Sequence, residues 1–281
     1  MKKALTWTGL LVTLFALLSA CGRGTASIAE GGGEEQIVKI GVVGDDLRDW
    51  EPAIARLKKE NITLDFVKFS DYNQPNEALA NGDVDLNSFQ HQAYLDKFNE
   101  QFNKNLVSIG NTVIAPLAIY SKQIKSLDDI KKGDEVLIPN DVTNGGRALI
   151  LLQEAGLLKV DKKAGITPTV KDILANPLAL KITEVDASQT ARGLNDATFA
   201  VINSGFAVDA GLDPAEEAIF SEPVNERSKP YVNIIVARPD DERTEILQKV
   251  VAAYQQDDTE QALQEKSKGA NVAAWKTFGQ K

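Results

Sequence analysis

The chain has 281 residues but only one cysteine and one histidine. A single cysteine, Cys21, excludes an intramolecular disulfide, so packing must stabilise the fold. A single histidine, His91, argues against a histidine-rich transition-metal site and against acid–base catalysis that uses several histidines. The sequence also lacks the Gly-x-Ser-x-Gly elbow of many hydrolases and the Gly-x-x-x-x-Gly-Lys spacing of a nucleotide-binding loop. We therefore expect no metal, no cofactor and no enzymatic activity; turnover of a peptide or an ester would be needed to argue for an exported hydrolase.

Positive charge is also scarce. There are 31 Lys and Arg residues against 40 Asp and Glu, which gives a formal net charge of −9 at pH 7. Removal of the first 20 residues would take away Lys2 and Lys3 and leave −11. An acidic chain repels phosphate backbones and anionic headgroups, so nucleic acid is not an expected partner. Hydrophobic residues at 43% and charged residues at 25% are ordinary for a globular protein, and we expect a monomer.

The longest apolar run lies at the N-terminus, where Ala4 to Leu18 follows the basic Met1-Lys2-Lys3. This run is shorter than the ~18 residues that a membrane-spanning helix needs, and it fits the hydrophobic region of a secretory signal. Leu18-Ser19-Ala20-Cys21 looks like a lipobox, in which small residues precede a cysteine that is lipidated after cleavage. The sequence therefore predicts a signal peptide over residues 1–20 and a lipid anchor on Cys21, which would hold the protein on the extracytoplasmic face of a cell membrane.

Residues 21–35 are small and polar and contain a run of three glycines, which indicates a flexible tether. The folded part then begins with an apolar strand at 37–43, helical spacing of apolar residues at 50–57 and an alternating strand at 62–66. Strand, helix and strand with short connections predict a βαβ unit and a parallel sheet flanked by helices.

Two later apolar runs organise the rest of the chain. The run at 113–120 contains Pro116, which cannot donate to a sheet, so the chain is expected to leave one sheet there. The run at 231–236 is the natural return segment. We predict an α/β fold with two lobes, each a mixed sheet flanked by helices. Lobe 1 would be built from 36–115 plus 232–281 and lobe 2 from 116–231, with C-terminal helices packed on lobe 1.

The loop Pro139 to Arg147 carries the first candidate site. It follows a strand and opens a helix expected over 148–155, with Thr143 or Asn144 as the cap. Free N–H groups at such a helix start suit an anion. Arg147 opposes the helix dipole in the expected first turn, which favours a role in gripping a carboxylate or phosphate. The alternative is a structural ion pair with an acid from the other lobe.

Further candidates are aromatic or amide residues. Tyr72, Phe89, His91 and Tyr94 could line one wall of a cleft, and aromatic rings favour polarizable groups such as a thioether. His91 could equally be a structural residue with satisfied hydrogen bonds. Two amides are also candidates: Asn203 ends an apolar strand, where ligands sit in α/β sheets, and Asn233 interrupts another. Either amide could instead be a satisfied turn or hinge residue.

Together these segments resemble the NlpA/MetQ family of lipoproteins, the substrate-binding subunits of methionine-uptake ABC transporters. Any one of the matching motifs is weak, but their order and spacing across nearly the whole chain after the leader are specific. The matching motifs include Lys39-Ile40-Gly41-Val42, Trp50-Glu51-Pro52, Ser70-Asp71-Tyr72, Phe89-Gln90-His91, Tyr120-Ser121-Lys122, Pro139-Asn140-Asp141, Gly146-Arg147-Ala148-Leu149, Val201-Ile202-Asn203 and Pro230-Tyr231-Val232-Asn233.

The resemblance implies a type II periplasmic-binding-protein fold whose two lobes close on one L-methionine, together with permease and ATPase subunits as partners. By matched motif it implies that the thioether lies among the predicted aromatic residues, that Arg147 and Asn144 bind the carboxylate, and that Asn203 and Asn233 bind the ammonium and carboxylate ends. Ser88 and the segment Ser204-Gly205-Phe206 depart from the family pattern. D-methionine, a Gly-Met dipeptide or another amino acid therefore stays an alternative ligand, and a surface lipoprotein that acts mainly through partner interaction stays an alternative function.

Overall fold

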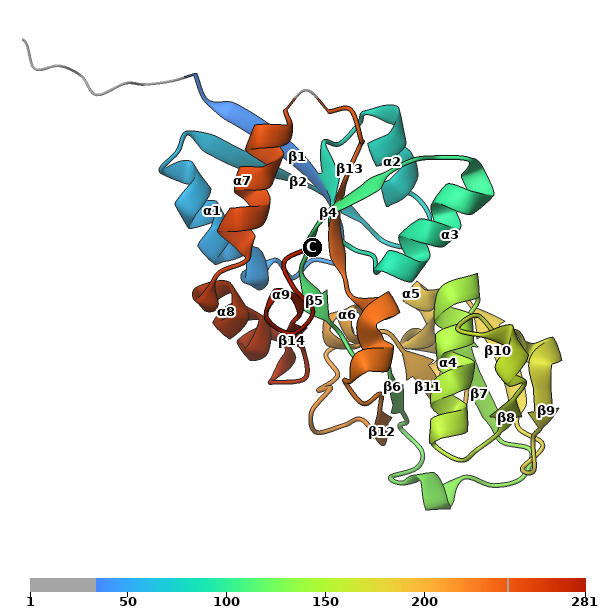
Figure 1. Ribbon diagram of the computed structural model, residues 1–281. Coiled ribbons are helices and arrows are strands. Elements are labelled where there is room, and N and C mark those ends of the chain that lie inside the picture. The colour runs from blue at the N-terminus through green and yellow to red at the C-terminus, as the bar shows by residue number, and fades with distance from the viewer. Residues whose placement is uncertain (1–33, 242) are drawn as a thin grey trace, which may run out of the picture. The chain divides into compact units, whose positions relative to one another are not determined.

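The computed structural model describes residues 34–241 and 243–281. The predicted signal peptide 1–20, the predicted lipidation site Cys21 and residues 21–33 of the predicted tether lie outside this part of the chain. Residues 34–281 form one compact unit. It contains two five-stranded sheets with helices around them, one built mainly from the blue, cyan and orange parts of the chain and the other from the green and yellow parts (Figure 1). We call the parts built on these sheets lobe 1 and lobe 2.

The sheet of lobe 1 has the strand order β2-β1-β3-β13-β4. Its first three strands are parallel, and β13 and β4 join them in antiparallel pairs. β1 and β2 pair along their whole length and are connected by α1, so the predicted βαβ unit is confirmed. The strands are β1 (Gln36–Val43), β2 (Ile62–Phe69), β3 (Leu86–Asn87), β4 (Val107–Asn111) and β13 (Ile234–Ala237).

The sheet of lobe 2 follows the same plan in the order β10-β7-β11-β6-β12. β10, β7 and β11 are parallel, whereas β6 and β12 are antiparallel to their neighbours. Both lobes therefore combine a parallel core with antiparallel strands, as predicted for a mixed α/β fold. The strands are β6 (Ala118–Tyr120), β7 (Glu135–Pro139), β10 (Lys181–Val185), β11 (Phe199–Ile202) and β12 (Phe220–Ser221).

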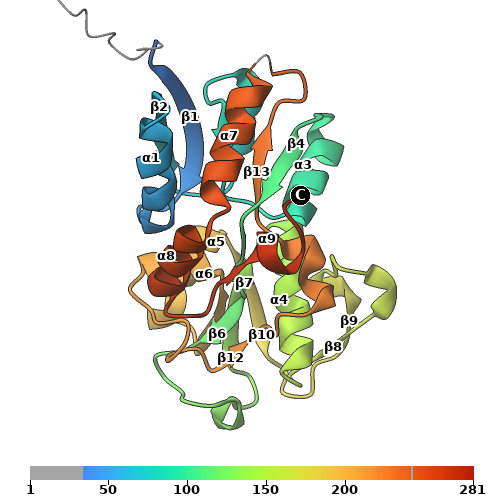
Figure 2. The same ribbon diagram turned by 60° about the vertical axis from the view of Figure 1, so that its left-hand side comes forward.

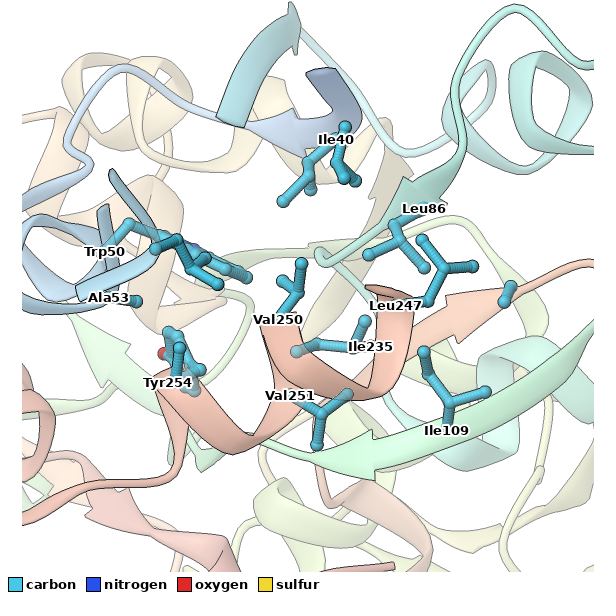
Figure 3. Packing of buried hydrophobic residues seen from close by; sticks show 14 of the residues in the cluster. Ile40, Trp50, Ala53, Leu86, Ile109, Ile235, Leu247, Val250, Val251 and Tyr254 are labelled. Carbon is cyan, nitrogen blue, oxygen red and sulfur yellow. The ribbon is translucent and has the colours of Figure 1, made fainter. Parts of the chain in front are cut away.

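Each sheet is covered by helices on both faces, as alternation along its strands shows. In β13, Ile235 and Ala237 join the core with α1, α7 and α8, and Ile234 and Val236 join the core with α2 and α3. Figure 3 shows the first of these cores, where Val250 and Val251 of α7 lie near Ile235. The helices are α1 (Glu51–Lys58), α2 (Pro75–Asn81), α3 (Gln92–Phe102), α4 (Val142–Glu154), α5 (Ala187–Thr190), α6 (Ser204–Asp209), α7 (Thr244–Tyr254), α8 (Asp257–Ser267) and α9 (Ala274–Thr277).

The chain passes between the two sheets twice, at 112–117 and at 222–233. On the first passage, β5 and β6 lie on opposite sides of Pro116, which confirms that the apolar run is broken there. β5 pairs with β14 near the C-terminus, and α7 packs against α1 in lobe 1 (Figure 2). The exact lobe boundaries at 115/116 and 231/232 stay a proposal. The minor strands are β5 (Val113–Ile114), β8 (Lys159–Val160), β9 (Ile173–Ala175) and β14 (Val272–Ala273).

Six short 3-10 helices complete the described elements: Arg48–Trp50, Leu127–Asp129, Lys162–Ala164, Val170–Asp172, Arg192–Asn195 and Glu226–Tyr231. A capping box of Ser126 and Asp129 opens the second of these turns. Across residues 34–241 and 243–281, no helix is long and apolar enough to cross a membrane.

Gly110 permits the close approach of α7 to the sheet of lobe 1. A Cβ atom at this position would lie 2.4 Å from Cγ1 of Val251. Val251 is 5% exposed and belongs to the core between the sheet and α7. Any larger side chain at position 110 must therefore displace α7 or force Val251 into another rotamer.

We expect Gly110→Ala to lower the free energy of unfolding by about 1–3 kcal/mol, because it overpacks this core. The measurement is urea unfolding of the wild type, Gly110→Ala, Val251→Ala and the double variant. Since the second substitution opens the space that the first one needs, the double variant should lose less than the sum of the single losses. Strictly additive losses would contradict the proposed contact.

Candidate functional site

A cavity of about 160 Å³ is lined by residues of both lobes. Its volume suits a small molecule better than a drug-sized ligand, whose pockets are typically about 300–1,000 Å³. All eight residues predicted from the sequence to bind a ligand line this one cavity: Tyr72, Phe89, His91, Tyr94, Asn144, Arg147, Asn203 and Asn233. The fold thus brings together side chains that are up to 161 positions apart in the sequence, from Tyr72 to Asn233.

One wall of the cavity is aromatic. The ring centroid of Tyr72 lies 5.8 Å from that of Phe89 and 6.1 Å from that of Tyr94, and Phe89 and Tyr94 are 5.8 Å apart. Phe206 of α6 adds a fourth ring from lobe 2, 4.9 Å from Tyr72. The hydroxyl of Tyr94 donates to the backbone carbonyl of Tyr72 at 3.0 Å. Because burial raises the pKa of both tyrosines, this wall is uncharged at neutral pH.

A buried amide network supports the aromatic wall from behind. Gln90 donates to Asn76 at 2.5 Å and to Asn87 at 2.9 Å, and Asn87 donates to Asn76 at 2.8 Å. All three are at most 3% exposed. They fix the segment that carries Phe89 and His91. This role was not predicted, although three amides next to apolar strands are visible in the sequence.

The helix that carries Arg147 begins earlier than predicted. α4 starts at Val142 rather than at 148, its N-cap is Asp141 rather than Thr143 or Asn144, and Arg147 lies in its second turn. The two glycines that suggested a loop are needed for close packing instead. A Cβ on Gly145 would lie 2.7 Å from the carbonyl oxygen of Pro139, and one on Gly146 would lie 2.7 Å from Cα of Thr167.

Asn144 is oriented by this cap. The carboxylate of Asp141 accepts hydrogen bonds from the backbone N–H and from the side-chain Nδ2 of Asn144, each at 2.9 Å. Asn144 Oδ1 consequently faces the other way, where it accepts from Asn203 Nδ2 at 2.8 Å and lies 3.3 Å from His91 Nε2. The predicted contact of Asn144 with a ligand carboxylate stays a prediction, and the hydrogen bonds show that it organises its neighbours.

His91 is held as the neutral Nε2–H tautomer. It is the N-cap of α3, and its Nδ1 accepts from the backbone N–H of Tyr94 at 3.1 Å, so Nε2 carries the hydrogen that is directed to Asn144. Burial, together with the positive charge of Arg147, lowers the pKa of His91 to about 3. Its ring packs edge-on against Tyr231, with 5.4 Å between centroids. These contacts agree with a structural role for His91 at the edge of the cavity.

Two amides of the site have unused polar atoms. Asn203 is 8% exposed, and its Oδ1 is buried without a hydrogen-bond partner among the described residues. Asn233 uses its backbone N–H and C=O in bonds to Val113 and Thr112, whereas its side-chain amide forms no hydrogen bond within the described part of the chain. Buried polar atoms are normally paired, so an unpaired acceptor in a cavity indicates a position for a ligand donor.

Arg147 does form an ion pair, as the structural alternative predicted, but the acid follows a strand of its own lobe and does not come from the other lobe. Glu222, directly after β12, accepts hydrogen bonds from Nε and Nη2 of Arg147. Glu222 was not among the predicted site residues, and it lies 75 positions from Arg147 in the sequence. No hydrogen bond of Arg147 Nη1 is present in residues 34–241 and 243–281, and Arg147 lines the cavity. This leaves an N–H donor for a ligand.

Two of the remaining charged side chains at the cavity, Asp49 and Lys266, are paired with each other. Lys266 binds the carboxylate of Asp49 at 2.8 Å and the backbone carbonyl of Asp46 at 2.5 Å. Asp49 also accepts from the hydroxyl of Tyr254 at 2.8 Å. No group of three or more His, Cys, Asp or Glu residues that could hold a metal ion occurs in the described ranges.

The two lobes also touch around the cavity, so a ligand inside would be held between them. Opening these contacts would give access to the site, in the manner of hinge closure around a ligand. The side-chain contacts between the lobes include His91–Asn144 at 3.3 Å, Asn73–Asp186 at 3.2 Å, Ser204–Asn271 at 3.1 Å and Asp213–Lys268 at 2.6 Å.

The cavity therefore has a polar end and an apolar end. The unused Nη1 donor of Arg147 and the unpaired Oδ1 of Asn203 mark the polar end, and four aromatic rings form the apolar end. This arrangement suits a small zwitterion with an apolar side chain, because each end of such a molecule finds the group that it requires.

Comparison with known proteins gives a consistent result. The NlpA lipoprotein family matches residues 38–275 of the chain. The chain is 41% identical over 242 residues to the D-methionine-binding lipoprotein MetQ of Escherichia coli strain K12, covering 85% of this chain and 88% of that one. It is 40% identical over 269 residues to the probable D-methionine-binding lipoprotein MetQ of Vibrio cholerae, covering 94% of this chain and 99% of that one.

Solved structures show the same architecture at similar identity. Protein PG110 from Staphylococcus aureus has a TM-score of 0.81 and 45% identity, covering 84% of this chain and 93% of its own. The substrate binding protein of a methionine transporter from Streptococcus pneumoniae has a TM-score of 0.81, 41% identity and coverage of 85% and 96%. A nutrient binding protein from Burkholderia cenocepacia bound to methionine has a TM-score of 0.80, 41% identity and coverage of 84% and 99%.

We expect a histidine-dependent loss of stability in mild acid. The folded protein keeps His91 neutral down to a pKa of about 3, whereas the unfolded chain binds a proton near pH 6.5. The contribution of the neutral histidine is thus fully present above pH 6.5 and is lost as the pH falls, by about 2 kcal/mol between pH 8 and pH 5.

The measurement is the free energy of unfolding against pH for the wild type and His91→Gln. Because the chain has one histidine, the difference between the two curves isolates its titration. The variant should lose less stability than the wild type in this range. Parallel curves would contradict the neutral, buried state of His91.

Proposed function

Since the chain belongs to the NlpA lipoprotein family, we propose that it binds methionine outside the cytoplasm and delivers it to an ABC importer. The names of the relatives support the ligand: two are D-methionine-binding lipoproteins or probable ones, and one similar structure is bound to methionine. Another is the substrate binding protein of a methionine transporter, which supports the partner. The geometry of the cavity supports the same ligand independently of these names.

In the proposed pose, the charged groups of the ligand lie at the polar end of the cavity and its side chain lies at the apolar end. Arg147 Nη1 donates to the carboxylate, and Asn203 Oδ1 accepts from the ammonium. The side-chain amide of Asn233 lies at the same polar end and can bind either group. The thioether lies among Tyr72, Phe89 and Tyr94, since sulfur near an aromatic ring gains about 0.3–1.5 kcal/mol.

The single observation that carries this proposal is the unpaired Oδ1 of Asn203. Its amide cannot simply be turned round, because Nδ2 donates to Asn144 Oδ1 and that oxygen is directed by Asp141. An unpaired buried acceptor costs about 1–3 kcal/mol. An ammonium group removes this cost, which makes an amino acid a better ligand than an uncharged or purely anionic molecule of the same size.

The proposal extends to the location of the protein and its lack of catalysis. We propose that Cys21 is lipidated and that residues 21–35 tether the binding unit close to the permease and its ATPase, which raises its effective concentration there. We propose no catalytic role for His91. The Nδ1 lone pair of its neutral ring accepts the hydrogen bond from the N–H of Tyr94, so the ring cannot act as a general base.

The direct experiment is calorimetric titration of the protein, freed of co-purifying ligand, with L-methionine, D-methionine and L-norleucine. We expect one methionine per chain, with norleucine about 2- to 10-fold weaker, because a methylene group replaces the sulfur among the aromatic rings. The two enantiomers decide the stereochemistry of the natural ligand. Failure of both to bind would refute the proposed function.

Substitution of the unpaired amide provides a second test. Asn203→Ala should weaken methionine binding about 10- to 100-fold, as expected for a hydrogen bond to a charged group. The matched control is Asn195→Ala, since Asn195 is exposed on lobe 2 and its side chain bonds to Lys122 and to Arg192 of its own helix turn. Equal affinities for Asn203→Ala and the control would remove the ammonium assignment.

A further inference from the structure

Glu222 lies behind the proposed ligand-binding arginine rather than in the cavity. Its two carboxylate oxygens lie 3.0 and 3.1 Å from Nε of Arg147, and one of them also accepts from Nη2. Oε2 is in addition 3.3 Å from the backbone N–H of Leu117. The side chains of Arg147 and Glu222 are 3% and 14% exposed. Glu222 borders the groove on the far side of Arg147, and it does not line the cavity of the proposed ligand.

The other contacts of Arg147 complete its orientation. Nη2 donates to the carbonyl of Ala115 at 3.1 Å, and the guanidinium carbon lies 4.4 Å above the ring of Tyr231. Ala115 and Tyr231 belong to the two segments that pass between the lobes. The Nε and Nη2 edge of the guanidinium is therefore fully used, and only Nη1 is left without a hydrogen bond in the described part of the chain.

A buried guanidinium without a counter-charge would be unstable while the cleft is empty. It would also be free to turn about its long side chain, and that freedom would be lost again when a ligand binds. Glu222 removes both costs in advance, because it balances the charge and fixes the plane of the guanidinium. The cation and the acid together bring no net charge to the polar end of the cavity.

We propose that Glu222 is a positioning residue that presents Arg147 Nη1 to the ligand carboxylate and matches the site to a zwitterion. The inference rests on the proposed function. An amino acid zwitterion carries no net charge, so its ammonium is not repelled by a pair that is neutral as a whole. Without Glu222 the site would carry one extra positive charge, which repels the ammonium and favours an anion that lacks it.

The test compares L-methionine with 4-(methylthio)butanoate, which keeps the thioether and the carboxylate but has no ammonium. Both affinities are measured by competition calorimetry on the full chain. We expect Glu222→Gln to weaken methionine binding by about tenfold, since charge-assisted hydrogen bonds are lost. We also expect it to shrink the preference for methionine over the butanoate, because only methionine has an ammonium to repel.

A second variant separates the effect of the negative charge from the effect of side-chain length. Glu222→Asp keeps the negative charge but is one methylene shorter, so it should weaken methionine binding while the preference over the butanoate stays as in the wild type. It also keeps the inference testable should Glu222→Gln fail to fold. The matched control is Glu154→Gln, which makes the same chemical change in the same lobe and groove, at a pair with the exposed Arg227. Its affinities should equal those of the wild type.

Three outcomes would overturn the inference. Unchanged methionine affinity in both Glu222 variants would show that Glu222 does not position Arg147. Equal weakening of both ligands in Glu222→Gln would reduce Glu222 to a structural role. A wild-type protein that binds no methionine would refute the proposed function and this inference together, whereas the first two outcomes leave the proposed function intact.

Discussion

The hydrogen bonds of Asp141 to Asn144 set the polarity of the whole site. Asp141 accepts from both the backbone and the side chain of Asn144, so Asn144 Oδ1 has one available direction. That oxygen accepts from Asn203 Nδ2, and it faces the Nε2–H of the His91 tautomer that the backbone N–H of Tyr94 selects. The outward Oδ1 of Asn203 is the last member of this sequence of hydrogen bonds. A single helix cap thus determines which atom meets the ligand, although Asp141 itself does not line the cavity.

Electrostatic and apolar recognition use different parts of the two lobes. Arg147, Asn144 and Asn203 belong to α4 and to the end of β11 in lobe 2, whereas Asn233 at the same polar end comes from the segment that passes between the lobes. Tyr72, Phe89 and Tyr94 come from lobe 1, and Phe206 meets Tyr72 from α6 across the cleft. Since the two lobes supply different ends of the site, a ligand with both a charged and an apolar end contacts both lobes only when they are closed. Such a ligand favours the closed form by its differential contacts.

Much of this was predictable from the sequence, and the failures have physical reasons. Apolar periodicity identified the strands β1 and β11 closely and showed where the chain changes sheets at Pro116. It placed the start of α4 six residues too late, because Gly145 and Gly146 have low helix propensity. The tertiary structure requires glycine at both positions, because the backbones of Pro139 and Thr167 approach them closely. Such contacts between distant segments cannot be predicted from the pattern of residue types along the sequence.

The same limit applies to the site. Residue type, position along the chain and the family resemblance were enough to select eight residues that all line the cavity. Their partners were not predictable, because Glu222 meets Arg147 only through the pairing of β12 with β6. Whether Arg147 carries a free charge or a balanced one depends on that pairing. The sequence could therefore predict which side chains gather at the cavity, but neither their partners outside it nor the direction in which each one donates or accepts.

The most direct test of this account is a crystal structure with L-selenomethionine, analysed by anomalous scattering at the selenium edge. The chain has sulfur only at Met1 and Cys21, so bound selenium has no competitor within residues 34–281. The account predicts one selenium peak in the cavity, among the rings of Tyr72, Phe89 and Tyr94, with the ligand carboxylate at Arg147 and its ammonium at Asn203. A selenium peak beside Arg147, or none in the cavity, would contradict it.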